Sequence, residues 1–423
     1  MGMFYKVPIR GVTWGAPEFR AIARATFVGP PKDAIPELAA YLEQQYGGRA
    51  IPVNSGRSAV ELALRRLRRQ TNQPHPSVLT PSLICRAVPD KIVAADLTPV
   101  FYDISPNLSP SVESLRHAIR PDTIAVVFPY LYGKVVPVEG VATFCKQAGI
   151  ALIEDCAASF LLPYPTGSLS GAHGDYVIFS FQRGKTTVAG GGGALGDRTA
   201  TPYSYEVTNW APGELRKLHL SKMTFMLEEV FLRTGYLLQR TVGLPQDFFR
   251  STMEQVREIS PLDCGLVLTQ MEKWPAIVAG RERVLRRYAS NLAGNPHLHL
   301  PQCLDGGFAT RVFVKFSGAI SDRPRPHEWT SAVADYMRGK GIEVHMPYFP
   351  VHRMSGFAQY SGSELPVTDE FYQSLLEIPA QPSLQDDEID YVCECLIQAA
   401  ATSLETPPAV LSRLATHQSD ESA

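Results

Sequence analysis

Two residues of opposite charge follow separate apolar runs of this chain, and their positions suggest chemistry. Lys185 closes the segment that begins at Phe179 and stands shortly before four consecutive glycines, Gly190 to Gly193, while Asp155 ends an earlier apolar run. A buried lysine beyond a strand can form a Schiff base with an aldehyde, and a carboxylate after an earlier strand can keep a pyridine nitrogen protonated. The pair therefore indicates a pyridoxal phosphate site, in which both charges make the cofactor ring an electron sink.

A nucleotide-binding P-loop is the alternative interpretation of the same segment. Gly184-Lys185-Thr186 copies the end of that motif, and a glycine cluster lies nearby. The phosphate cradle of a P-loop needs another glycine five residues before Gly184, but Phe179 occupies that position, and the glycine cluster follows the lysine instead of preceding it. The spacing argues against a P-loop.

Length, composition and charge favour an ordinary globular α/β protein. The chain has 423 residues, 45% of them apolar, which is enough for one large domain and a smaller companion. Its formal net charge is −2, with acids and bases interspersed, so we expect neither nucleic acid nor an anionic membrane as a partner. The expected partners are small molecules or other protein subunits.

The cysteines indicate a reducing compartment. The seven cysteines are odd in number, scattered and mostly inside apolar runs. Cys393 and Cys395 form the closest pair, but two residues at this spacing on a helix point to different faces, so we expect no bound metal. No segment resembles a signal peptide or is apolar enough to cross a bilayer, so we expect a cytoplasmic protein without a transmembrane segment.

The candidate residues must be positioned by a mostly parallel sheet. Short apolar, β-rich runs alternate with helix-like segments, as parallel strands buried on both faces do; the runs are 77–80, 99–102, 124–128, 151–153 and 176–179. Ligands of such sheets bind beyond the carboxyl ends of the strands, where Ser82, Asp155 and Ser180 are expected. These residues should therefore converge on one edge.

A helix is expected to begin before the first of these runs, and its amino terminus could bind a phosphate. Asn54-Ser55-Gly56-Arg57-Ser58 leads into an amphipathic helix with a capping-type beginning. The amino terminus of a helix binds anions, although a plain helix cap would have the same sequence. The presence of Lys185 and Asp155 favours the phosphate seat.

Three parts are expected along the chain, and the first of them contains an insertion. Residues 1–290 form a large cofactor-binding domain with an N-terminal arm over 1–45, residues 291–405 form a smaller α/β domain, and 406–423 form a disordered tail. Residues 201–256 interrupt the strand-helix alternation and are expected to be an inserted helical region. This region could cover the active site, pack on a partner subunit or touch a membrane surface, and the sequence does not decide between these roles.

The ordered motifs resemble the DegT/StrS-type aminotransferases, which are pyridoxal phosphate enzymes of fold type I that mostly aminate keto sugars attached to nucleotides. The resemblance covers nearly the whole chain, through the motifs Asn54–Ala59, Thr80–Ser82, Thr98–Asp103, Leu131–Gly133, Ile153–Asp155, Ser180–Phe181, Lys185, Tyr348–His352, Ile378–Leu384 and Asp387–Ile389. It implies a large domain with a mostly parallel sheet, a smaller α/β C-terminal domain, and a homodimer with shared active sites.

The resemblance also implies roles for the candidate residues. It makes Lys185 the Schiff-base lysine and Asp155 the partner of the pyridinium nitrogen. Ser180, together with the helix start, matches the residues that bind the cofactor phosphate; the helix-start positions are Gly56 and Arg57. In a separate loop, His352 and Tyr348 match residues near the substrate, although a buried structural histidine is an equal alternative.

Several positions depart from the family pattern. Ala158 replaces a glutamine near the phenolic oxygen of the cofactor, Cys85 replaces the aromatic residue that stacks on the ring, Arg57 replaces a threonine, and Gly191 replaces a glutamate. The glycine-x-asparagine segment that reaches across the dimer is missing around residues 254–258. Arg183 could supply a replacement charge for the phosphate, or it could face solvent.

The expected function is transfer of an amino group from an amino acid, such as glutamate or glutamine, to a keto sugar in polysaccharide or natural-product biosynthesis. The resemblance suggests that this sugar is linked to a nucleotide. Lys185 would also carry a proton between substrate and cofactor, since burial beside a cationic ring favours its neutral amine. Dehydratases of the family have histidine in place of the lysine, so Lys185 argues against that branch. Another pyridoxal phosphate reaction, amination of a ketone that is not a sugar, and a non-catalytic cofactor-binding regulator remain as alternatives.

Overall fold

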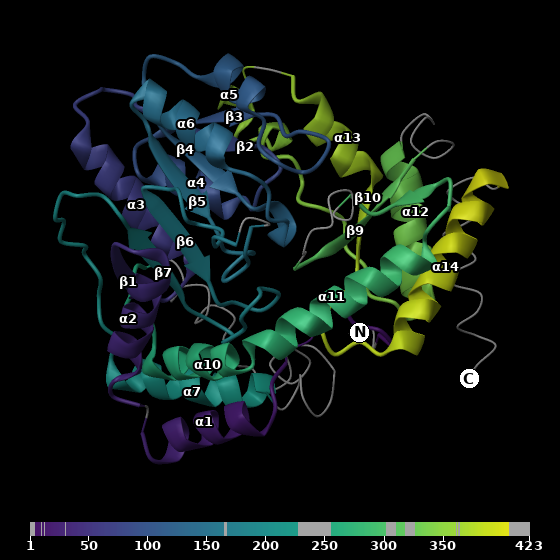
Figure 1. Ribbon diagram of the computed structural model, residues 1–423, viewed down its shortest axis with the longest axis horizontal. Helices are drawn as coiled ribbons and strands as arrows, with labels where there is room; N and C mark the ends of the chain where they lie inside the picture. Colours follow the sequence, from purple (N-terminus) through teal and green to yellow (C-terminus); the bar gives the residue numbers. More distant parts are fainter. Residues whose placement is uncertain are drawn as a thin grey trace.

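The protein contains two β-sheets. We analysed a computed structural model that describes residues 5–9, 11, 13–29, 31–164, 167–226, 255–301, 310–317, 326–360, 362 and 364–405. Within these residues, one sheet has seven strands in the order β1-β7-β6-β5-β4-β2-β3, and the other has three in the order β10-β9-β8. Figure 1 shows the larger sheet surrounded by helices and the smaller one lying beside α12 and α14.

Strands β2 to β6 of the large sheet run parallel, while β7 is antiparallel to both of its neighbours, β6 and β1. The small sheet is antiparallel. The mostly parallel sheet confirms the predicted α/β class. The strands are β1 (Arg49–Val53), β2 (Ser77–Pro81), β3 (Thr98–Tyr102), β4 (Thr123–Pro129), β5 (Ala151–Asp155), β6 (Tyr176–Ser180), β7 (Gly193–Asp197), β8 (Leu298–His299), β9 (Val312–Phe316) and β10 (Leu375–Ile378).

The described helices cover both faces of the large sheet, and some of them also pack against the small one. They are α1 (Ala16–Phe27), α2 (Ala34–Tyr46), α3 (Gly56–Gln70), α4 (Ala87–Ala94), α5 (Val112–Ala118), α6 (Glu139–Ala148), α7 (Pro212–Met226), α10 (Pro261–Glu272), α11 (Trp274–Asn291), α12 (Pro326–Gly339), α13 (Pro366–Ser374) and α14 (Asp386–Glu405). Short 3₁₀ turns cover Leu131–Gly133, Val351–Arg353 and Ala358–Tyr360.

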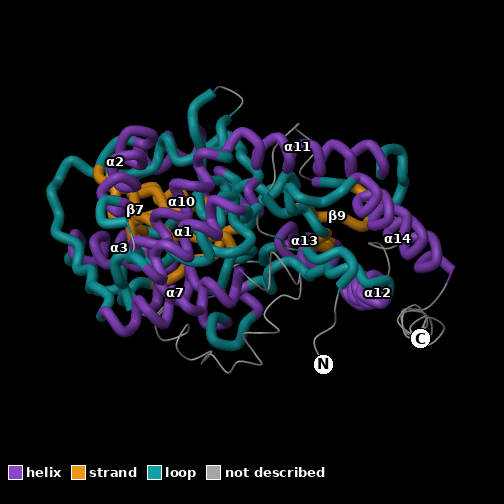
Figure 2. Tube along the Cα trace, turned by 90° about the horizontal axis from the view of Figure 1, so that it is seen from below, coloured by secondary structure: helices purple, strands orange, loops and turns teal. Residues whose placement is uncertain are grey.

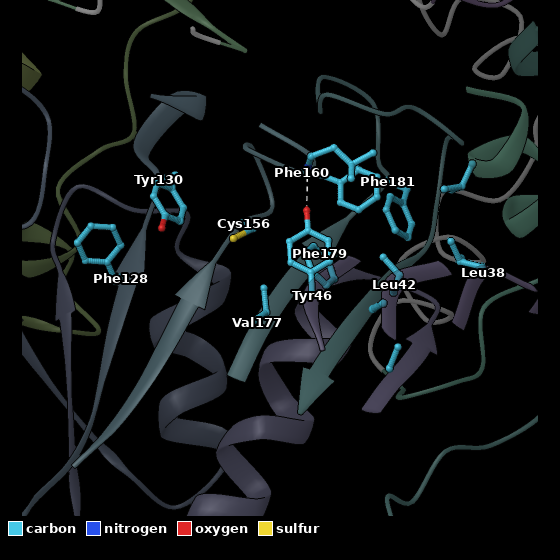
Figure 3. Packing of buried hydrophobic residues seen from close by; sticks show 14 of the residues in the cluster. Leu38, Leu42, Tyr46, Phe128, Tyr130, Cys156, Phe160, Val177, Phe179 and Phe181 are labelled. Atoms are coloured by element: carbon cyan, nitrogen blue, oxygen red, sulfur yellow. Dashed lines mark hydrogen bonds between the residues drawn. The ribbon is translucent and has the colours of Figure 1, made fainter. Parts of the chain in front are cut away.

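Alternate side chains of the parallel strands enter two different cores, because successive residues of a strand point to opposite faces. Leu152 lies in the core with α2, α6 and α10, whereas the next residue, Ile153, lies in the core with α3 and α4. Figure 3 shows the first core around Tyr46 and Phe179, whose ring centroids are 4.6 Å apart. Burial on both faces explains why these strands are continuous apolar runs in the sequence.

Helix α11 connects the two sheets. Figure 1 shows it running from α10 toward α14, and the view from below in Figure 2 shows β9, α12 and α14 gathered at its far end. Its second half contributes Val284, Leu285 and Tyr288 to the core around the small sheet. The start of the chain joins the same core, since Val7 is fully buried and pairs with Ile342.

Two of the expected segments fall partly or wholly outside the described residues. Of the expected insertion 201–256, the structure describes α7 and its flanks, while 227–254 lie outside; the expected tail 406–423 lies entirely outside. Among the helices that are described, none is both long and apolar enough to span a membrane.

Candidate active site

The start of α3 and the end of β6 meet at the carboxyl edge of the large sheet. Ser55 caps α3, and its Oγ accepts a hydrogen bond of 3.1 Å from the backbone N–H of Ser58. A Cβ on Gly56 would lie only 2.9 Å from the Cβ of Ser180, so a larger residue does not fit without displacement. This close approach leaves the first N–H groups of α3 beside Ser180, an arrangement suited to a phosphate.

The glycine run after Lys185 packs behind the start of α3. We call the start of α3, together with Ser180, the cradle. Gly192 has a φ of +87°, which favours glycine, and its N–H donates a hydrogen bond of 3.0 Å to the carbonyl of Asn54. A Cβ on Gly193 would lie 2.5 Å from the backbone nitrogen of Gly56. The glycines therefore allow β7 to pass directly behind the start of α3.

Asp155 and Lys185 lie at the same end of the sheet. The carboxylate of Asp155 accepts a hydrogen bond of 3.0 Å from the N–H of Ala157. Burial raises the pKa of Asp155, while the positive charge of Lys185 and the hydrogen bond from Ala157 act in the opposite direction. The two residues thus interact electrostatically across the site, as the positions of their strands predict.

Lys185 belongs to a short turn after β6. Both the backbone N–H and the backbone carbonyl of Lys185 form hydrogen bonds. Its N–H donates to the carbonyl of Gln182 at 3.2 Å, and its carbonyl accepts a hydrogen bond of 3.1 Å from Arg281. The two residues that follow, Thr186 and Thr187, have buried hydroxyl groups without a hydrogen-bond partner among the described residues. Buried polar atoms of this kind are normally satisfied, so a bound polar group fits here.

The residues that depart from the family pattern have side chains with few groups that could contact a cofactor. Ala158 has no polar side-chain atom, and its carbonyl accepts a hydrogen bond from Thr310. Cys85 is a partly buried free thiol in the segment between β2 and α4, and Arg57 is exposed on the first turn of α3. Contacts that glutamine and an aromatic ring make in the family are therefore not reproduced at Ala158 and Cys85.

The positive charge of Arg183 acts on Glu343, which lies in the segment that precedes Tyr348. Burial tends to raise the pKa of Glu343, but hydrogen bonds from His345 and Ile9, together with the charge of Arg183, bring that pKa below its usual value. The expectation that Arg183 pairs with the phosphate remains a prediction.

His352 connects the loop after β2 with α13. Its Nδ1 lies 2.7 Å from the Oγ of Ser82, and its Nε2 lies 3.5 Å from a carboxylate oxygen of Asp369. Burial lowers the pKa of His352, and the nearby Asp369 opposes this shift. These contacts are consistent with the structural alternative for His352, and a role in substrate binding remains a prediction.

Tyr348 packs in an aromatic and cationic cluster. Its ring stacks on Tyr132 with centroids 5.5 Å apart, and the guanidinium of Arg311 lies 5.1 Å from its centroid. Arg311 in turn forms an ion pair with Glu377, which is buried in β10. Neither Arg281 nor Arg311 was predicted from the sequence, since each is far along the chain from Lys185 and stands in no motif.

Sequence comparison assigns the family. A profile of the DegT/DnrJ/EryC1/StrS aminotransferase family matches residues 30–200 and 239–397. The chain belongs to this family. It is a pyridoxal phosphate-dependent aminotransferase, as predicted.

Relatives of this aminotransferase act on nucleotide-linked sugars according to their names. The dTDP-4-dehydro-2,3,6-trideoxy-D-glucose 4-aminotransferase of Saccharopolyspora spinosa is 26% identical over 346 residues, which are 81% of this chain and 82% of the relative. The dTDP-3-amino-3,4,6-trideoxy-alpha-D-glucose transaminase of Micromonospora megalomicea subsp. nigra is 29% identical over 354 residues, 82% of this chain and 84% of the relative.

Solved structures share the fold of the aminotransferase. PseC of Helicobacter pylori, an aminotransferase involved in the biosynthesis of pseudoaminic acid, superposes with a TM-score of 0.72 at 17% identity, covering 95% of this chain and 100% of that one. The PLP-form of Spr1654 from Streptococcus pneumoniae gives a TM-score of 0.73 at 19% identity, covering 95% and 100%. The fold type I architecture predicted from the motifs is confirmed.

Proposed function

We propose that this aminotransferase transfers an amino group from an amino acid, such as glutamate or glutamine, to a keto sugar linked to a nucleotide. One observation carries the proposal: Lys185, Asp155 and the cradle formed by Gly56 and Ser180 lie at the same edge of the sheet. The names of the relatives, which include enzymes for dTDP-, UDP- and GDP-linked sugars, support this class of acceptor. Other ketones and other pyridoxal phosphate reactions are the competing assignments.

Each residue of the site has a role in this proposal. When bound, the cofactor supplies an electron sink next to the carbon that gains or loses the amino group. Lys185 holds the cofactor covalently and later moves a proton with its Nζ, and Asp155 stays ionised opposite the pyridine nitrogen. The N–H groups at the start of α3 and the hydroxyl of Ser180 bind the phosphate.

The protein is further proposed to be a cytoplasmic homodimer in which the subunits share active sites. The family resemblance supports the dimer, and the free cysteines of the described residues support a reducing compartment. A monomer in light scattering at working concentration would contradict the shared site.

Absorption spectroscopy tests the transfer. Wild-type protein with pyridoxal phosphate is expected to develop a visible band that glutamate bleaches, and a keto-sugar nucleotide that accepts the amino group is expected to restore it. Lys185→Ala should form no such band, whereas Lys146→Ala, which changes an exposed lysine of α6, should behave as the wild type. A stable band that no amino acid changes would overturn the proposed transfer.

A further inference from the structure

A buried arginine of α11 binds the backbone of Lys185. Arg281 is 8% exposed, and its guanidinium donates hydrogen bonds to two backbone carbonyls, that of Lys185 at 3.1 Å and that of Thr310 at 2.8 Å. Burial lowers the pKa of this guanidinium to about 10, so the group stays charged at neutral pH. Among the described residues no carboxylate pairs with Arg281, so its charge is spent on these two carbonyls.

Thr310, the second residue that Arg281 binds, is fixed to the large sheet. Its N–H donates a hydrogen bond of 3.0 Å to the carbonyl of Tyr132 in the 3₁₀ turn after β4, and its hydroxyl donates to the carbonyl of Ala158. The neighbouring Gly133 has a φ of +84°, and a Cβ there would lie 2.7 Å from the Cβ of Thr310, so this close packing requires a glycine. Thr310 is thereby joined to the segment that leaves β5.

Through Thr310, Arg281 links the turn of Lys185 to the segment that follows Asp155. The pairing of β5 with β6 ends at Asp155 and Ile178, before either segment reaches these contacts. Beyond the end of a strand pair, the spacing of two segments is set by supporting contacts from other elements. The link formed by Arg281 and Thr310 is such a contact, because it connects the segments that carry the oppositely charged pair.

Attachment of the cofactor to Lys185 depends on this spacing. The amine of Lys185 must reach the aldehyde carbon, where a carbon–nitrogen double bond forms and the aldehyde oxygen leaves as water with the two protons of the amine. The cradle would bind the phosphate, and Asp155 would bind the ring nitrogen, so the position of the lysine turn decides whether the amine reaches the carbon. A misplacement of about 1 Å can slow such a step roughly 100-fold.

We propose that Arg281 is a positioning residue for Lys185: by joining the carbonyl of Lys185 to Thr310, it sets the distance between the lysine turn and Asp155 that cofactor attachment requires. The inference rests on the proposed function, since it takes Lys185 as the lysine that holds the cofactor. Arg281 acts through the backbone, so its removal leaves the amine of Lys185 and the cradle chemically unchanged. Binding of the cofactor and its covalent attachment should therefore respond differently to a change at Arg281.

Two probes separate binding from attachment in the full-length protein freed of cofactor. Pyridoxal phosphate can be attached, whereas pyridoxine phosphate has an alcohol in place of the aldehyde and can only bind. At saturating pyridoxal phosphate, the visible band of Arg281→Gln should appear roughly 10- to 100-fold more slowly than that of the wild type, because a charge-assisted contact that positions the turn is lost. The affinity for pyridoxine phosphate, measured by fluorescence titration, should be that of the wild type. Arg281→Lys, which keeps the charge but loses the planar fork, should give an intermediate rate.

A double-mutant cycle tests the link between Arg281 and Thr310. Thr310→Val removes the hydroxyl that donates to Ala158 and keeps the shape of the side chain. This variant should slow attachment less than Arg281→Gln does, because the N–H of Thr310 still donates to Tyr132. The double variant should be no slower than Arg281→Gln, since two contacts in series fail when one is broken. Thr310→Ser, which keeps the hydroxyl, should attach the cofactor as the wild type does.

Arg283→Gln is the matched control. Arg283 lies on the same helix, but its partners are Asp386 and the carbonyl of Leu384, away from the turn of Lys185. The control should attach pyridoxal phosphate at the rate of the wild type. If Arg281→Gln does not fold, Arg281→Lys and Thr310→Val carry the test, because each weakens the link without removing the buried side chain.

Equal attachment rates of the wild type and Arg281→Gln would overturn the inference and leave Arg281 as a structural contact of α11. Parallel losses of attachment rate and of affinity for pyridoxine phosphate would also overturn it, because they would indicate a general disturbance of the site. Fully additive effects in the double-mutant cycle would contradict the link through Thr310. Failure of the proposed function has a different signature: the visible band would then form in Lys185→Ala as well, or would not respond to glutamate, whatever the rate in Arg281→Gln.

Discussion

The carboxylate of Asp263 lies 3.2 Å from the position that a Cβ on Gly191 would occupy. The same carboxyl group forms an ion pair of 2.7 Å with Lys222, whose ammonium also donates to the carbonyl of Ala189 at 3.1 Å. Gly191 stands where the family resemblance leads us to expect a glutamate. In this chain, the carboxylate beside the glycine turn therefore comes from Asp263 of α10 and not from a glutamate in the turn itself.

Removing this acid should destabilise the protein, because Lys222 and Asp263 are both about 5% exposed and the described residues offer the ammonium no second counter-charge. We expect Asp263→Asn to lower the free energy of unfolding by about 3–5 kcal/mol. Chemical denaturation measures this change. Glu370→Gln, which breaks the more exposed pair with Lys315, is the control and should cost less than about 1 kcal/mol. Similar losses in the two variants would contradict a special role for Asp263.

Moving the acid onto the turn should compensate for its loss. Gly191 does not have a positive φ, so its backbone can accept a glutamate, but in Gly191→Glu the new carboxylate would compete with Asp263 for Lys222. We expect the single variant to be destabilised and the double variant Gly191→Glu, Asp263→Ala to be more stable than the sum of its single changes, by about 1–3 kcal/mol. Strict additivity in denaturation experiments would show that the two positions do not share one charge site.

The cradle at the start of α3 should be sensitive to a single methyl group. In Gly56→Ala the added Cβ would lie 2.9 Å from the Cβ of Ser180, so the helix start must shift. We expect a loss of stability of about 1–3 kcal/mol and weaker binding of pyridoxal phosphate, measured by fluorescence titration. Gly213→Ala is the control, because no heavy atom of the described residues lies within 4 Å of a Cβ built there. Unchanged cofactor binding in Gly56→Ala would argue against the phosphate seat.

The sequence was sufficient to predict that Lys185, Asp155 and Ser180 meet. Parallel strands share one carboxyl edge, so residues after separate apolar runs converge without any knowledge of their distance. The helix start at Gly56 was also recognisable, since capping depends on a few adjacent residues.

Contacts made across the fold could not be predicted in the same way. Arg281 reaches Lys185 from the middle of α11, and nothing in the residues around it distinguishes it from the other arginines of that helix. Asp263 likewise meets Gly191 only because α10 packs behind the glycine turn. Such pairs depend on how elements pack in three dimensions, which local patterns do not encode.

Asp155 should show opposite effects on stability and on cofactor binding. Burial raises the pKa of its carboxyl above the value of the unfolded chain, so at neutral pH the ionised group disfavours the folded apo protein, and protonation relieves this at low pH. Asp155→Asn is therefore expected to leave the apo protein at least as stable as the wild type at pH 7. The difference in unfolding free energy between the two proteins should shrink as the pH falls toward about 4.

Binding of pyridoxal phosphate by the same variant should weaken at least tenfold, roughly 1.4 kcal/mol, because the pyridinium loses its counter-charge. Denaturation of the apo protein over this pH range and cofactor titration measure the two effects separately. An apo protein that is clearly less stable at pH 7, with cofactor affinity unchanged, would mean that the carboxylate of Asp155 serves the fold instead of the cofactor.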